Sequence, residues 1–120
     1  ENNKLEFVSS DGFDWIKKYG QDNMIILTSR GVLEYFAESR LKTFFEHLNK
    51  FGKYIFIAIE PTGINHNFLI NPNSEIYGSE NSFSHNYKSI FEKSGFNIWH
   101  QSRIKYTHPE CYINFNKKKN

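Results

Sequence analysis

The chain has 120 residues and a mass of 14.3 kDa, which is the size of a single domain. Hydrophobic residues make up 38% of it and charged residues 23%, a composition that excludes a disordered tail. The net charge of +2 is too small for a nucleic-acid platform, and no apolar run reaches the roughly 18 residues that a membrane helix needs.

The first part of the chain alternates short apolar runs with amphipathic segments. Residues 5–8 are apolar and predict a strand that ends at the turn Asp11-Gly12. The spacing of apolar side chains over residues 13–19 predicts a helix that stops at Gly20. Residues 24–27 form a continuous apolar run, which predicts a buried parallel strand with helices on both faces.

The middle of the chain repeats this pattern. A turn and a helical turn over residues 32–36 are predicted before an amphipathic helix that ends at Gly52. The unbroken apolar run of residues 54–59 is the strongest strand signal, and Pro61 and Gly63 end it. The apolar stripe of the helix has the spacing i, i+3, i+4, i+7 and consists of Leu41, Phe44, Phe45 and Leu48.

The last part begins with a polar, asparagine-rich stretch over residues 62–82, predicted as a loop. Loops of more than about 15 residues are usually functional or mobile. A helix is expected from about Ser84, with Gly95 as its stop. Residues 97–105 and 111–115 predict two strands of an antiparallel hairpin at the edge of the sheet.

The predicted order is β-α-β-α-β-loop-α-β-β in a single domain over residues 1–120, because no repeat or linker divides the chain. Alternating strands and helices predict an α/β fold with a mostly parallel sheet, right-handed crossovers and helices on both faces. Ligands of such sheets bind beyond the carboxyl ends of the strands. The expected ligand-binding segments are residues 9–13, 28–33 and 60–65.

The only cysteine, Cys111, excludes an internal disulfide and fits a reducing, cytoplasmic compartment. The first four residues carry no apolar signal segment. The chain opens without methionine, from which we expect a processed or truncated product.

Four stretches occur in a recognisable order: residues 7–15, 22–35 and 59–61, then a helix over residues 83–96 followed by two strands. Together they resemble the second half of a class I S-adenosylmethionine-dependent methyltransferase. The resemblance implies a Rossmann-like fold, in which residues 5–8, 24–27 and 54–59 are the third, fourth and fifth strands. The last two predicted strands correspond to the sixth and the antiparallel seventh.

The resemblance also implies that half of the domain is missing. The family's first two strands and its glycine-rich turn have no counterpart, since no G-x-G-x-x-G occurs. We therefore expect methyl transfer from S-adenosylmethionine to a small-molecule or unknown acceptor, with this chain inactive alone. The expected partner is the amino-terminal half of the same domain or a self-associated copy, which would cover the open edge of residues 24–27.

The resemblance places the cofactor near the first two predicted turns. Asp11 would accept a hydrogen bond from the adenine amino group, and the backbone of Phe13 would meet a ring nitrogen. The alternative for Asp11 is a helix N-cap with Asp14 three residues on. The full predicted cofactor set is Asp11, Gly12, Phe13, Ser29, Arg30 and Gly31.

Each remaining candidate also has a structural alternative. The second turn could be an ordinary strand-to-helix connection, and Leu33 and Phe36 could be core residues instead of walls of the adenine site. Glu60 could orient or deprotonate an acceptor, or could be a solvated strand-end residue.

The start of the predicted last helix supplies the other acceptor candidates. Asn86 and Tyr87, with Glu60, are the predicted acceptor-binding residues, and His85 is a second candidate base. The alternative is that Ser84 caps the helix and Tyr87 packs in the core.

Metal binding is not predicted, because the five histidines are scattered. Only His108-x-x-Cys111 has the spacing of metal ligands, and no second pair accompanies it. Residues 117–119 form a basic tail that is expected to be solvated.

Two other functions remain open. The first is a non-catalytic α/β interaction module that associates through an open sheet edge. The second is a different doubly wound nucleotide-binding enzyme.

Overall fold

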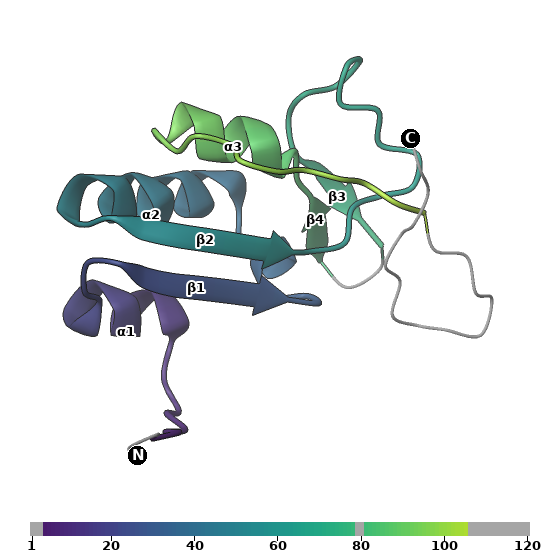
Figure 1. Cartoon of the computed structure of the whole chain (residues 1–120). Helices are drawn as coiled ribbons and strands as arrows, with labels where there is room; N and C mark the ends of the chain where they lie inside the picture. Colours follow the sequence, from purple (N-terminus) through teal and green to yellow (C-terminus); the bar gives the residue numbers. More distant parts are fainter. Residues whose placement is uncertain (1–3, 79–80, 106–120) are drawn as a thin grey trace.

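The computed structural model describes residues 4–78 and 81–105 and shows a mixed α/β fold (Figure 1). A two-stranded parallel sheet lies at its centre, formed by β1 (Met24–Ser29) and β2 (Tyr54–Ile59). The strands are paired in register from Met24 beside Tyr54 to Ser29 beside Ile59. Both strands coincide with predicted apolar runs, and their parallel direction confirms the expected βαβ connection.

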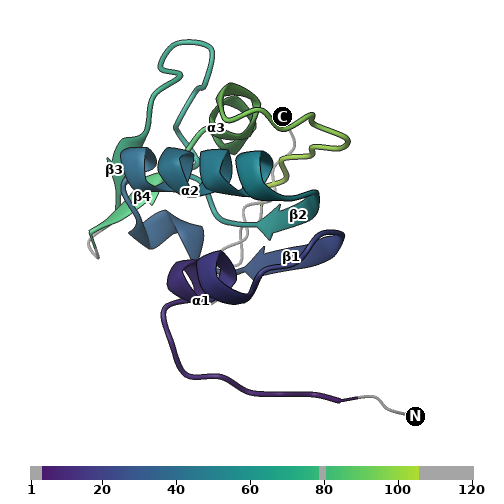
Figure 2. The same ribbon diagram turned by 90° about the vertical axis from the view of Figure 1, so that its left-hand side faces the viewer.

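Three α-helices accompany the sheet: α1 (Gly12–Tyr19), α2 (Glu38–Phe51) and α3 (Tyr87–Lys93). A 3-10 turn, η1 (Leu33–Tyr35), lies between β1 and α2, where the sequence predicts a helical turn. Helices α1 and α2 lie on the same side of the strands (Figure 2). None of the helices described is both long and apolar enough to cross a lipid bilayer.

Aromatic side chains build the core between the sheet and the helices. The predicted stripe of α2 is buried throughout. At its centre, Phe45 stacks on Phe91 of α3 at a centroid distance of 4.2 Å, and meets Phe56 of β2 edge-on at 5.2 Å. Phe13 of α1 stacks on Phe44 at 4.0 Å. The core therefore joins all three helices to one face of the sheet.

The region predicted as one long loop contains a second, antiparallel pair of strands. Strand β3 (Glu75–Tyr77) pairs with β4 (Ser82–Ser84). Helix α3 begins later than predicted, at Tyr87, because Asn86 is its N-cap and accepts the backbone N–H of Ser89. The prediction that Ser84 caps this helix is wrong, since Ser84 lies in β4.

Three predictions about strands and their burial are wrong for the described residues. Residues 5–8 are extended but form no strand, and the side chain of Phe7 is 89% exposed. Residues 97–105 also form no strand. The sheet has helices on one face only, since alternate side chains of β1 and β2 are exposed. Within the described residues, no segment pairs with residues 5–8 or 97–105, and no helix covers the second face of the sheet. A strand is stable only where its backbone groups and its apolar faces find partners. Residues 111–115 lie outside the described part of the chain.

Candidate functional site

The carboxyl ends of β1 and β2 bring two of the three predicted ligand-binding segments together. The backbone N–H of Arg30 donates to the carbonyl of Ile59 at 2.8 Å. Beyond it, Glu60 Oε1 accepts the N–H groups of Val32 and Leu33 at 3.1 and 3.2 Å. Residues 28–33 and Glu60 therefore form one continuous edge, as the parallel order of the strands predicts.

An unusual backbone conformation aims these N–H groups at Glu60. Arg30 and Gly31 both have positive φ angles, 63° and 83°. This left-handed region is costly for a residue with a side chain. A Cβ atom at Gly31 would also lie 2.7 Å from Glu34 Oε2. The turn therefore requires glycine at position 31, where the sequence predicted a close backbone approach.

Glu60 is a partly buried carboxylate with only one of its oxygens engaged. Burial raises the pKa of Glu60, and the backbone N–H groups of the turn oppose that rise. Glu60 Oε2 has no hydrogen-bond partner, and two other buried oxygens, Thr28 Oγ1 and Tyr87 Oη, also lack one among the described residues. Burial raises the pKa of Tyr87 as well, and the charges of Glu60 and Glu34 add to the rise. The site is therefore an acidic environment in which Tyr87 stays protonated.

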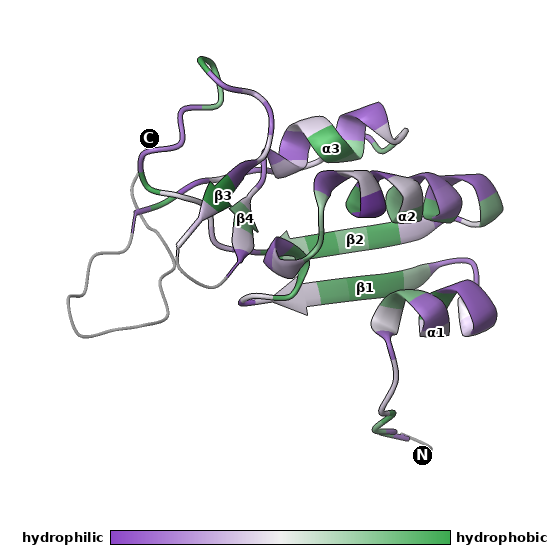
Figure 3. Ribbon diagram, turned by 180° about the vertical axis from the view of Figure 1, so that it is seen from behind, coloured by the Kyte–Doolittle hydropathy of each residue, from purple (hydrophilic) through white to green (hydrophobic). Residues whose placement is uncertain are grey.

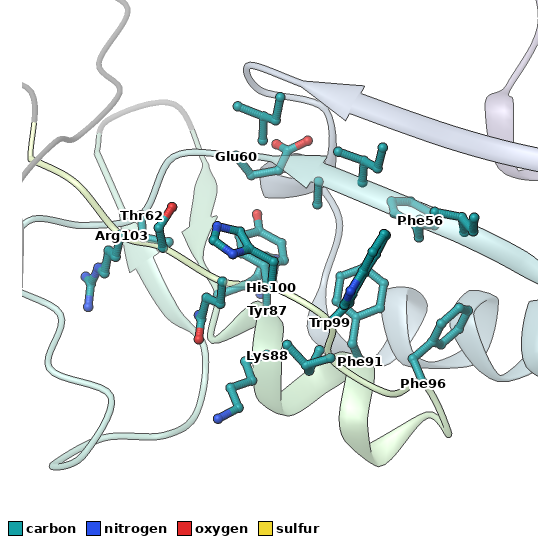
Figure 4. A pocket seen from close by; sticks show the side chains of 18 of the residues that line it. Phe56, Glu60, Thr62, Tyr87, Lys88, Phe91, Phe96, Trp99, His100 and Arg103 are labelled. Carbon is teal, nitrogen blue, oxygen red and sulfur yellow. The ribbon is translucent and has the colours of Figure 1, made fainter.

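A cleft of about 920 Å³ opens beside this edge, along the free side of β2 and between β2, α3 and residues 97–104. In Figure 4, Glu60, Thr62 and Arg103 lie toward one end, and Phe56, Phe96 and Trp99 toward the other. The cleft therefore joins hydrogen-bonding groups to an apolar, aromatic wall, which is the usual composition of a small-molecule site.

Arg103 holds the outer wall of the cleft in place. Its guanidinium donates to Thr62 Oγ1 at 3.1 Å and to the carbonyls of Gly63 and His66 at 2.8 and 2.9 Å. It also stacks over Phe68, with Cζ 4.2 Å from the ring centroid. Sequence reasoning missed Arg103, because no local pattern indicates contacts with residues about 40 positions away.

Asp11 has the capping role that was the alternative to adenine binding. Its Oδ1 accepts the N–H groups of Phe13 and Asp14 at 2.9 and 3.1 Å, and its Oδ2 pairs with Arg40 of α2 at 3.1 Å. The backbone N–H of Asp14 and the Arg40 guanidinium lower the pKa of Asp11. Both oxygens are therefore engaged within the protein, by the helix cap and by Arg40.

The other residues near the predicted adenine site divide between the core and the surface. Phe13 and Leu33 are buried, and Phe36 packs against the core at a centroid distance of 4.5 Å from Phe13. Gly12 has open space around its Cα. Ser29 is exposed at the end of β1.

His85 is completely buried and anchors three elements. Its Nε2 lies 2.9 Å from the carbonyl of Phe36, so Nε2 carries the proton and donates. Its Nδ1 lies 2.6 Å from Ser74 Oγ, which in turn lies 2.5 Å from Glu38 Oε1 of α2. These contacts link α2, the loop and the start of α3, and they place both ring nitrogens against protein atoms.

Burial predicts a pH dependence for His85. Burial lowers the pKa of His85, while the Phe36 carbonyl and the Glu38 carboxylate oppose the fall. As the pH drops below about 6.5, the unfolded chain therefore binds a proton before the folded chain does. The contribution of His85 to the free energy of unfolding is thus greatest above that pH and declines below it. Urea unfolding at a series of pH values measures this slope, and we expect His85→Gln to flatten it between pH 7 and 5.

His100→Gln is the matched control, because His100 is exposed and anchors nothing in the described chain. Glu38→Gln is expected to steepen the slope, since it removes the nearest negative charge. An unchanged slope in His85→Gln would contradict the anchoring role.

The described residues bring together no group of three or more histidine, cysteine or acidic side chains that could hold a metal ion. The predicted pair of metal-like spacing, His108 and Cys111, lies beyond Lys105 and outside the described chain. Comparisons with protein-family models, curated proteins and solved structures find no match for this chain.

Proposed function

We propose that this chain is the carboxyl-terminal part of a class I S-adenosylmethionine-dependent methyltransferase domain. In this proposal the sheet is Rossmann-like and ends in an antiparallel hairpin, and the domain methylates a small-molecule acceptor. One observation carries the proposal: a parallel strand pair joins the turn at residues 28–33 to Glu60 at its carboxyl edge, beside an open cleft. The reaction class itself rests on the resemblance of the sequence.

The chemistry is compatible with a site that has no nucleophile. Methyl transfer from a sulfonium is a direct displacement, in which the protein aligns donor and acceptor. In this proposal the acceptor enters the cleft, with its hydroxyl or amine toward Glu60 and Tyr87. The unengaged Oε2 of Glu60 supports this orientation.

The donor site fits the described chain only in part. The turn of Ser29, Arg30 and Gly31 offers backbone close to the carboxyl edge. Asp11, however, already uses both carboxylate oxygens, and the Phe13 ring lies in the core. We therefore propose that an amino-terminal half supplies most of the donor site and that the chain alone is inactive.

Calorimetric titration with S-adenosylmethionine tests the proposal. One sample holds the chain alone, and the other holds the chain mixed with the amino-terminal half of a class I methyltransferase domain. Saturable binding is expected only in the mixture, and Gly31→Val should abolish it because a β-branched residue is strained at the φ angle of 83° that the turn requires. Leu69→Ala, in an exposed loop, is the control that should leave binding unchanged.

Absence of binding in both samples would contradict the proposal. Binding of a dinucleotide in place of S-adenosylmethionine would favour a different nucleotide-binding enzyme.

A second candidate function is a non-catalytic interaction module. It is favoured by the bare face of the sheet, where Ile25 and Leu27 are 62% and 59% exposed. Strands β1 and β2 also have no partner except each other in the described chain. Self-association without any nucleotide binding would support this candidate.

A further inference from the structure

The face of the sheet turned away from α1 and α2 is apolar, and no described helix covers it; its β2 half also lines the cleft. We call it the outer face; it consists of the side chains at alternate strand positions, namely Ile25, Leu27, Ser29, Ile55, Ile57 and Ile59. Its five aliphatic side chains are each between 43% and 62% exposed. Figure 3 shows that hydrophobic residues dominate the middle of both strands.

An exposed face of this kind is unusual for a parallel sheet, whose two faces are normally both covered. Contiguous apolar patches of several hundred Å² mark interaction surfaces. The outer face carries no charged side chain at any of its six strand positions. A surface that is uncharged throughout can therefore meet a copy of itself across a two-fold axis without burying an unpaired charge.

The chain carries a second bare apolar element at its amino-terminal end. Residues 5–8, which we call the arm, lead away from α1, and their backbone runs apart from both strands (Figures 1 and 2). Leu5, Phe7 and Val8 of the arm are 80%, 89% and 55% exposed. In the sequence of the arm, the charged Glu6 separates the apolar Leu5 and Phe7, which is the alternation that a strand would need.

The amount of exposed apolar surface favours a partner that carries both an outer face and an arm. The five aliphatic side chains of the outer face are each only partly exposed, and alone they offer less than the roughly 800 Å² that a stable interface buries on each partner. The three exposed side chains of the arm enlarge the available apolar surface. A second copy of the chain supplies a second face and a second arm together.

We propose that two copies of this chain associate through their outer faces, and that the arm of each copy packs on the partner's sheet beside the open edge of β1. Within the described residues β1 has a neighbour on one side only. Its free backbone groups can therefore pair with an extended segment such as the arm. This association needs neither a nucleotide nor a methyl acceptor, but the arm and an amino-terminal half would compete for the same edge of β1.

Sedimentation velocity over a wide range of protein concentration, in buffer without nucleotide, tests the proposal. The unmodified chain is expected to dimerise. Leu27→Glu and Ile57→Glu on the outer face and Phe7→Glu on the arm should each raise the dimer dissociation constant at least about 30-fold, because each buries an unpaired carboxylate. All three positions are exposed in one copy, so the folded monomer tolerates the charge.

Leu69→Glu is the matched control. Leu69 is 96% exposed on the loop after β2, away from both proposed elements, so this variant should dimerise like the unmodified chain. Far-ultraviolet circular dichroism and a thermal melt confirm that each variant is folded.

The possible results separate the parts of the proposal. A monomeric unmodified chain at every concentration would overturn it, and this would also be the result if another protein or another segment covers the outer face. Equal weakening by Leu69→Glu would overturn it too, since the effect would then follow from charge alone. If the outer-face variants dissociate and Phe7→Glu does not, the role of the arm is wrong. The calorimetric titration tests methyl transfer separately. Ile57 also lines the cleft, so Leu27→Glu and Phe7→Glu, which lie outside it, are the variants that separate dimer formation from acceptor binding.

Discussion

Replacing Phe45 by alanine is expected to lower the free energy of unfolding by about 4 kcal/mol, the largest effect of any single substitution considered for this chain. Phe45 is completely buried, and its ring contacts aromatic rings from the sheet, α3 and the segment after α3. Alanine at this position would leave a cavity that rigid neighbouring rings cannot fill. Urea unfolding followed by circular dichroism measures the loss.

Phe51→Ala is the control on the same helix. The Phe51 ring is 63% exposed at the end of α2, so its removal should cost less than about 0.5 kcal/mol. A loss below about 1.5 kcal/mol for Phe45→Ala, or equal losses for the two variants, would show that the aromatic cluster is not the centre of the core.

Two substitutions at Glu60 are expected to have opposite consequences. Glu60→Ala should lower the free energy of unfolding by about 2 kcal/mol, because the N–H groups of Val32 and Leu33 lose their acceptor. Glu60→Gln keeps that acceptor and replaces a partly buried charge by a neutral amide. It should therefore be neutral or stabilising at pH 7.

The raised pKa of Glu60 adds a pH test to this comparison. A carboxyl whose folded-state pKa lies above its unfolded value of about 4.5 contributes stability at low pH and loses it as the pH rises through the folded pKa. The advantage of Glu60→Gln over the unmodified chain should therefore grow as the pH rises above about 4.5.

Urea unfolding of both variants at several pH values provides the measurement, with Glu92→Ala as the control. Glu92 is an exposed residue of α3, and its removal should change stability by less than about 0.5 kcal/mol. If Glu60→Gln were as damaging as Glu60→Ala, the negative charge itself would be what holds the turn.

The candidate site was predictable where it depends on strand direction. Consecutive parallel strands place their carboxyl ends at one edge, so residues 28–33 and Glu60 were expected to meet, and they do. The roles at this edge were less predictable. Glu60 and His85 look alike in sequence as candidate bases, yet Glu60 has one unengaged oxygen and His85 is buried with both ring nitrogens engaged. Burial and partners distant in sequence decide that difference.

The local patterns of the sequence determined helices α1 and α2, strands β1 and β2 and the apolar stripe of α2, because helical and strand periodicity depend on near neighbours. Only the tertiary structure decided which extended segments become strands. Residues 5–8 and 97–105 have strand-like composition but no pairing partner in the described chain, whereas the short, polar β3 and β4 have each other. A strand exists through backbone hydrogen bonds to another segment, and no local pattern specifies whether that segment is present.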